Sequence, residues 1–254
     1  MTQDAETARA NKIDEDPVNP DPRTVTVWSD IGCPWGTLAL HTLRVEARDR
    51  GEGMTIDHRA FPLELFNRMP TPKSILDAEM VIIAGQRPEL GWQLWNAADH
   101  TFPVTTLPAL EAVQAAKDPA VGGLRASDQL DEALRTAFYV DSKCISVHSV
   151  VLDVAASCSF VDHEALATLM GRGSGRTEVY QQWQVAKGPE IQGSPHVFTV
   201  GGFARHNPGV VYRWTAPPPL FGGRGFPRLD SYRQEWAGEL LDLLSGPTGP
   251  EQVV

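Results

Sequence analysis

The sequence has few cysteines. Cys33, Cys144 and Cys158 are the three cysteines among its 254 residues, and no two of them form a Cys-x-x-Cys pair. This spacing fits neither a zinc-ligand pattern nor a disulfide framework, so we expect no metal site. A chain without structural disulfides suits a reducing compartment, and we therefore expect a cytoplasmic protein.

Basic residues are also scarce. The chain has 22 Lys and Arg against 32 Asp and Glu, which gives a net charge of −10, and no basic cluster is visible. Because nucleic acids bind positively charged surfaces, this balance argues against a nucleic acid as the main partner.

Long apolar runs are absent as well. No stretch approaches the roughly 20 apolar residues that cross a bilayer, so we expect no membrane partner. Residues 1–22 are acidic and lack the apolar segment of a signal peptide, and their composition predicts a disordered tail. Residues 246–254 contain two prolines and a glycine between them, and we expect them to form a loose C-terminal tail.

One cysteine lies between a predicted strand and a predicted helix. The β-branched run over 24–29 predicts a buried strand, and the apolar spacing over 34–50 predicts a helix with Pro34 in its first turn. Cys33 is therefore expected at the helix N-terminus, where unpaired N–H groups and the helix dipole favour an anion. We expect this position to lower the pKa of Cys33 below its ordinary value of about 8.5 and to make it nucleophilic.

The remaining pattern predicts an α/β fold. A strand over 54–64 would complete a strand–helix–strand unit. Polar caps and apolar stripes predict helices over 74–84, 107–117, 127–140, 146–156, 163–170 and 176–187. Further along, we expect a hairpin around Gly201-Gly202, an ordered irregular segment over 207–228 and an amphipathic helix over 229–244.

Two parts of the chain resemble the DsbA family of thioredoxin-fold proteins. The run Cys33-Pro34-Trp35-Gly36 is similar to the Cys-Pro-Trp-x motif of the family's cytoplasmic branch. Residues 193–200 resemble the strand that follows the family's cis-proline. The resemblance implies an α/β, thioredoxin-like fold with a helical insertion subdomain. Its thioredoxin-like domain would comprise 24–65 and 175–245, and the insertion 66–174.

The same resemblance implies the residues of the site. Cys33 would be the catalytic residue, and Ser194 would lie beside it, before a proline in the cis form. The residues implied to contact the substrate or a small thiol are Pro34, Trp35, Gly36, Ser194 and Pro195.

Gly36 is the main departure from the family pattern, because the usual second cysteine stands there. Without it, a mixed disulfide on Cys33 must be resolved by an external thiol such as glutathione or mycothiol. Our first hypothesis is therefore a thiol–disulfide oxidoreductase that uses Cys33 alone, acts on a small-molecule thiol or disulfide and binds no cofactor tightly. Cys144 is the other candidate partner for Cys33, and we expect the two to be too far apart to bridge.

Two other readings stay open. The 2-hydroxychromene-2-carboxylate isomerases and the kappa-class glutathione transferases share this fold and act on a bound thiol cofactor, although they usually carry serine where this chain has Cys33. The third hypothesis is a binding module that has lost its catalytic activity. The sequence gives neither the physiological substrate nor the oligomeric state.

Several other side chains near the predicted site have two interpretations. Trp35 either packs in the core or forms an exposed apolar lip. His196 and His206 are expected to be structural. Asp57 and Glu64 are candidates for a buried acid that accepts a proton beneath the cysteine.

Overall fold

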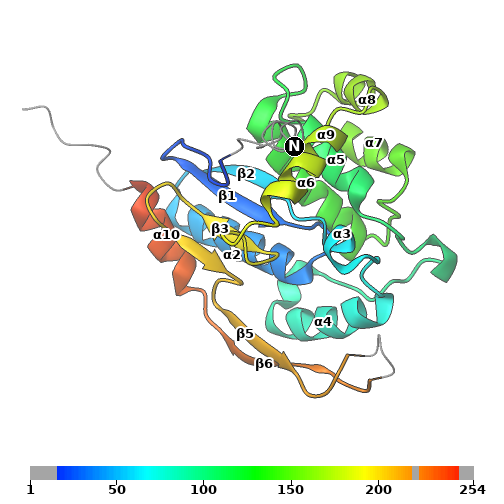
Figure 1. The fold of residues 1–254 in the computed structure, drawn as a ribbon, viewed down its shortest axis with the longest axis vertical. Coiled ribbons are helices and arrows are strands. Elements are labelled where there is room, and N and C mark those ends of the chain that lie inside the picture. The colour runs from blue at the N-terminus through cyan, green and yellow to red at the C-terminus, as the bar shows by residue number, and fades with distance from the viewer. Residues whose placement is uncertain (1–15, 219–222, 246–254) are drawn as a thin grey trace, which may run out of the picture.

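A four-stranded sheet carries the predicted site. The computed structural model describes residues 16–218 and 223–245. The strand order is β2-β1-β3-β4 (Figure 1). β1 (Thr24–Ser29) runs parallel to β2 (Thr55–Ala60) and antiparallel to β3 (His196–Phe198), which pairs antiparallel with β4 (Ala204–His206). The strand before Cys33 and the strand after Pro195 are therefore neighbours, as the predicted fold requires.

Two helices pack against one face of this sheet. They are α2 (Pro34–Arg50) and α10 (Glu235–Ser245), and their leucines form one apolar cluster with β1. Leu40, Leu43 and Leu240 are almost fully buried in it. α2 has the bounds that the sequence predicts, and it ends at Gly51 in the left-handed conformation (φ 68°), which glycine adopts without steric cost.

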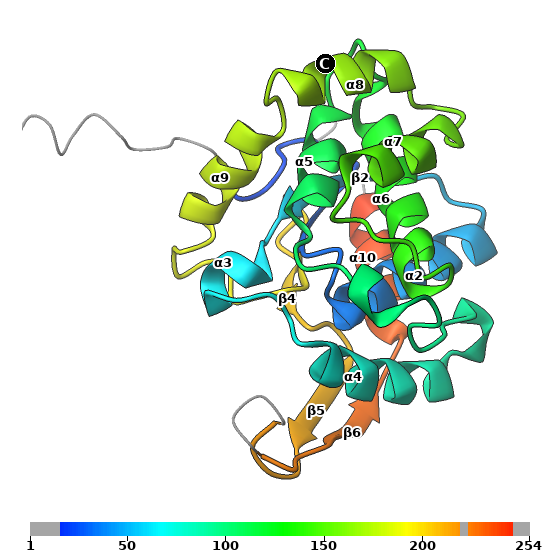
Figure 2. The same cartoon turned by 90° about the vertical axis from the view of Figure 1, so that its right-hand side faces the viewer.

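The chain between β2 and β3 is mostly helical. Its elements are α3 (Leu63–Asn67), α4 (Lys73–Gln86), α5 (Leu107–Ala115), α6 (Gly123–Tyr139), α7 (His148–Ala156), α8 (His163–Gly171) and α9 (Arg176–Val185), with short 3-10 helices at Pro88–Leu90 and Asp99–Thr101. Figure 2 shows α5 to α8 gathered on one side of the molecule. They share a second apolar core, which includes Ile31 of the cysteine loop, residues 30–33 between β1 and α2. Within the described ranges, every helix is too short or too polar to cross a bilayer.

The prediction for the C-terminal part was wrong in two places. The segment 207–228, expected to be irregular, contains β5 (Val210–Trp214) and the start of β6 (Pro227–Tyr232), which pair antiparallel. The helix expected over 229–244 therefore begins only at Glu235. Proline and glycine dominate the composition between the two strands and obscured the β-forming run at Val210. This hairpin lies beside α4 in both views (Figures 1 and 2), whereas residues 219–222 lie outside the described residues.

Other boundaries differ from the prediction. β2 ends at Ala60 instead of 64, because Pro62 leads into α3. α4 begins at Lys73 after Pro72, so the expected serine cap is not used. Asp162 does cap α8 as predicted, since its side chain accepts a hydrogen bond from the backbone of Ala165 at 3.0 Å.

Part of the predicted N-terminal tail lies against the sheet. Residues 1–15 and the C-terminal tail over 246–254 lie outside the described residues. The indole N–H of Trp28 donates to the carbonyl oxygen of Pro17 at 2.8 Å, and the backbone N–H of Asn19 donates to Thr26 Oγ1 at 2.8 Å. These hydrogen bonds hold residues 16–22 against the sheet, which corrects the prediction of disorder for this part.

Candidate functional site

Cys33 lies between the N-terminus of α2 and the loop before β3. It is the N-cap residue of α2, and its Sγ accepts a hydrogen bond from the backbone N–H of Gly36 at 3.4 Å. The thiol donates to the carbonyl oxygen of Ser194 at 3.3 Å. The Ser194–Pro195 peptide bond is cis. Ser194 thus contacts the sulfur through its carbonyl, while its hydroxyl accepts from the backbone N–H of Asp30 at 3.0 Å.

The predicted direction of the Cys33 pKa was wrong. The residue is only 4% exposed, and burial raises the pKa of its thiol to about 11. The negative charges of Glu79 and Asp30 add to this rise, and hydrogen bonds at Ser194 and Gly36 offset only part of it. Desolvation of a fully buried group shifts a pKa by several units, which exceeds the stabilisation from a helix N-terminus. Cys33 is therefore a neutral thiol at neutral pH.

We expect the alkylation rate of Cys33 by iodoacetamide to rise continuously from pH 7 to pH 10. Only the thiolate reacts, and below the pKa each pH unit lowers the thiolate fraction about tenfold. Peptide mass spectrometry after timed labelling would follow Cys33 separately from Cys144 and Cys158. A rate that levels off below pH 8 would mean that the thiolate is stabilised after all.

A cavity of about 370 Å³ opens onto the cysteine. The residues that line it include Cys33, Pro34, Trp35, Glu79, Ser194 and Tyr212. The structure thus brings together most of the residues that the sequence indicates. Gly36 and Pro195 lie outside the lining, and both are buried next to residues that belong to it.

Trp35 forms part of the cavity wall. Its side chain is 3% exposed and stacks on Tyr212, with ring centroids 4.3 Å apart and an angle of 24° between the planes. Trp35 is therefore not the exposed lip that was one of its two interpretations. Because Tyr212 belongs to β5, the hairpin that the sequence analysis missed contributes to the site.

Arg135 of α6 holds the cysteine loop through hydrogen bonds. Its guanidinium donates to the carbonyl oxygen of Asp30 at 3.2 Å, to Thr37 Oγ1 at 2.8 Å and to Ser29 Oγ at 2.9 Å. It also forms two hydrogen bonds with the carboxylate of Asp131, at 2.7 and 3.0 Å. These contacts join β1, the cysteine loop and α2 to the helical insertion.

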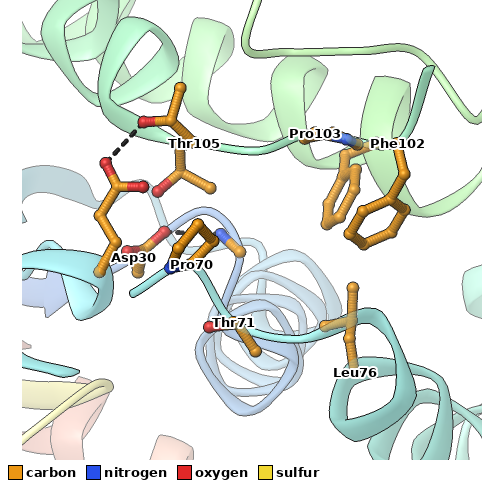
Figure 3. Close-up of a pocket in the computed structure, with 11 residues that line it drawn as sticks. Asp30, Pro70, Thr71, Leu76, Phe102, Pro103 and Thr105 are labelled. Atoms are coloured by element: carbon orange, nitrogen blue, oxygen red, sulfur yellow. Dashed lines mark hydrogen bonds between the residues drawn. The ribbon is translucent and has the colours of Figure 1, made fainter. Parts of the chain in front are cut away.

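A second, smaller cavity lies behind the cysteine loop and holds two carboxyl groups. Its volume is about 30 Å³, and Figure 3 shows Asp30 and Thr105 on one side of it, with Phe102 and Leu76 on the other. Asp30 accepts hydrogen bonds from the backbone of Gly32 and Leu63, each at 2.8 Å, and burial raises its pKa.

Asp57 and Glu64, which the sequence suggested as proton acceptors beneath the cysteine, do not line the Cys33 cavity. Glu64 lines the smaller cavity and accepts a hydrogen bond from Thr105 Oγ1 at 2.5 Å, and burial raises its pKa. Asp57 pairs with Lys117 at 2.5 Å and with Arg59 at 2.8 Å. Asp30, which the sequence analysis did not consider for this role, is the acid adjoining the cysteine loop.

The histidines and the other cysteines lie away from the main cavity. His196 is buried and accepts from the backbone of Gln192 at 3.1 Å, and burial lowers its pKa to about 4. His206 lies next to it on β4, with ring centroids 6.1 Å apart. Cys144 and Cys158 are free thiols and do not line the cavity. Across the described ranges, no three His, Cys, Asp or Glu side chains are grouped as a metal site would need.

The sequence analysis missed Glu79 and Arg135. Glu79 lies on the buried stripe of α4 with Leu76, Met80 and Ile83. A charged residue on an otherwise apolar stripe is a signal in the sequence, because lone buried charges are costly. Arg135 lies on the buried face of α6 and carries the same signal.

Comparisons with known proteins identify the fold. No family model and no curated protein matches the chain. A structure described as a probable DsbA oxidoreductase from Streptomyces coelicolor matches with TM-score 0.60 and 14% identity, covering 91% of this chain and 93% of its own. The cytosolic disulfide reductase DsbM from Pseudomonas aeruginosa matches with TM-score 0.52 and 16% identity, over 87% and 95%.

Two further structures extend this comparison. DsbM with GSH matches with TM-score 0.51 and 17% identity, over 87% and 95%. A 2-hydroxychromene-2-carboxylate isomerase matches with TM-score 0.50 and 16% identity, over 69% and 84%. At these identities the likeness shows the fold alone. The chain has the thioredoxin-like fold with a helical insertion that the sequence predicts.

Proposed function

We propose that the protein is a thiol–disulfide oxidoreductase of the DsbA type that uses Cys33 alone. The observation that carries the proposal is the position of Cys33, whose sulfur lies on the wall of a cavity beside Ser194 with a glycine at position 36. The sulfur of Cys33 would attack one sulfur of a small disulfide. This forms the S–S bond of a mixed disulfide and breaks the S–S bond of the small disulfide. The departing half takes up the proton that Cys33 loses and leaves as a thiol.

An external thiol would complete the cycle. It attacks the mixed disulfide, restores the Cys33 thiol and leaves as a new disulfide, so electrons and protons balance over the two steps. We propose glutathione or mycothiol for this role, with no tightly bound cofactor. The GSH in the DsbM structure supports a small-thiol partner at this kind of fold. A cytoplasmic location is part of the same proposal, because a reducing compartment supplies such thiols.

The raised pKa of Cys33 favours the reducing direction. DsbA is a strong oxidant because its reduced form is stabilised. Cys33 lacks this stabilisation, since burial raises the pKa of its thiol to about 11. A thiol with a high pKa is a strong nucleophile once ionised but a poor leaving group, so its mixed disulfide should persist until another thiol attacks it.

A thiol-cofactor isomerase or transferase is the second candidate. The observation that favours it is the neutral Cys33 thiol, which donates a hydrogen bond as a serine hydroxyl would. In that case Cys33 would bind a cofactor thiol without forming a disulfide with it. A non-catalytic binding module would show neither behaviour.

The test is intact mass after incubation with oxidised small thiols. We expect the wild type to gain one thiol adduct, removable by a reductant, and Cys33→Ser to lose that adduct. Double replacement of Cys144 and Cys158 by serine is the control, and it should keep the adduct. Saturable thiol binding without a mass change would favour the second candidate, whereas an inert Cys33 would leave only the binding module.

A further inference from the structure

Glu79 is a buried acid in the wall of the Cys33 cavity. It projects from α4, is 7% exposed and lines the same cavity as the sulfur. Trp35 and Tyr212, which are both uncharged, are the side chains that favour its charged form. Burial raises the pKa of Glu79 to about 7, so much of the population carries a negative charge at neutral pH.

Among the residues that the structure describes, no cation compensates this charge. In the described part of the chain, Glu79 forms no ion pair with Lys, Arg or His, and no such residue influences its pKa. Two other buried acids differ, because Asp131 is paired with Arg135 and Asp57 with Lys117. A buried carboxylate without a cation is costly unless a ligand supplies one.

We propose that Glu79 selects small disulfides that carry an ammonium group close to the sulfur. The ammonium would pair with the Glu79 carboxylate while one sulfur of the ligand meets Cys33 across the cavity. The stacked rings of Trp35 and Tyr212 line the same cavity wall, where Glu79 is shielded from water by burial. This inference rests on the proposed function and names its substrate class.

The position of Glu79 also disfavours anionic ligands. Of the described residues that line the cavity, none is Lys or Arg, and the ionisable ones are Cys33, Glu79 and Tyr212. A ligand carboxylate close to the sulfur would meet the Glu79 charge without a compensating cation, whereas the two carboxylates of glutathione lie farther from its sulfur. Of the small disulfides, cationic ones should therefore react fastest and anionic ones slowest.

The experiment compares three disulfides of similar length. Cystamine is cationic, hydroxyethyl disulfide is neutral and dithiodipropionate is anionic. The rate of mixed-disulfide formation on Cys33 is measured by intact mass and divided by the rate of a free cysteine with the same disulfide. We expect the normalised rate for cystamine to exceed that for the neutral probe by about 10- to 100-fold, as expected for a hydrogen bond to a charged group.

Two variants locate the effect. In Glu79→Gln, which keeps the size of the side chain, the preference for cystamine should disappear and the normalised rate for dithiodipropionate should rise. Asp77→Asn removes the same charge from α4 outside the cavity and should keep the wild-type preference. The comparison of the three probes in the wild type already tests the inference without any variant.

Each other outcome has a distinct meaning. Equal normalised rates in the wild type would overturn the selection by Glu79 and leave the proposed function standing. If Glu79→Gln lowered the normalised rate by the same factor for all three probes, Glu79 would act on the Cys33 thiol and not on the ligand. That result would also overturn the selection by Glu79. No adduct with any probe would overturn the proposed function itself, and the inference with it.

Discussion

Gly36→Cys should reduce insulin disulfides with dithiothreitol as electron donor, whereas the wild type should not exceed the uncatalysed rate. A Cβ atom built at Gly36 lies 3.6 Å from Cys33 Cβ, and disulfides need about 3.5–4.5 Å. The new thiol could therefore attack a mixed disulfide on Cys33 directly. Because the attack becomes intramolecular, we expect turnover to rise by roughly 100-fold or more.

Gly36→Ser is the matched control. Its side chain has nearly the same size and no thiol, and it should remain inactive with insulin. The added Cβ would lie 3.3 Å from the Cβ of Ser29, so a small local shift is expected in both variants. Equal insulin reduction by wild type and Gly36→Cys would show that another cysteine already resolves the intermediate.

The geometry at Gly36 also favours ionisation of a cysteine introduced there. The backbone N–H of Gly36 donates to Cys33 Sγ, so this position contributes a hydrogen bond through its backbone. Arg135 Nη1 would lie 3.6 Å from an added Cβ. A guanidinium this close would help a cysteine at position 36 to ionise, which favours attack on the mixed disulfide.

The sequence predicted the frame of the site because that frame depends on local patterns. The β-branched run of β1 and the apolar spacing of α2 place Cys33 at a helix N-terminus, and both elements have the predicted bounds. The pairing of β1 with β3 followed from the resemblance of the two motif regions. β1 and α2 were predictable because each is formed by one continuous stretch with the residue pattern typical of a strand or a helix.

The chemical environment of Cys33 was not predictable in the same way. Its burial depends on α3, α4 and β5, which approach it from distant parts of the sequence. The helix N-terminus was a correct local observation, but the desolvation that outweighs it is a property of the assembled fold. The contribution of Tyr212 was missed for a simpler reason, since its strand was not recognised.

Buried charges connect the cysteine loop with the helical insertion, and this suggests a test of stability. Arg135→Met should lower the free energy of unfolding by about 3–5 kcal/mol, because it leaves Asp131 buried without its closest cation. The carboxylate of Asp131 would keep only His58 at 3.6 Å and Arg44 at 4.0 Å. Urea denaturation followed by circular dichroism measures the change.

A second variant separates the charge from the packing. In the double variant Asp131→Leu/Arg135→Met, no buried charge of the pair is left alone, so the loss should be smaller than in Arg135→Met. Arg213→Met is the exposed control: its 3.0 Å ion pair with Asp230 lies at the surface and should contribute about 0–1 kcal/mol. A loss below about 1 kcal/mol in Arg135→Met would mean that water or the remaining cations compensate Asp131, and that Arg135 does not stabilise the cysteine loop.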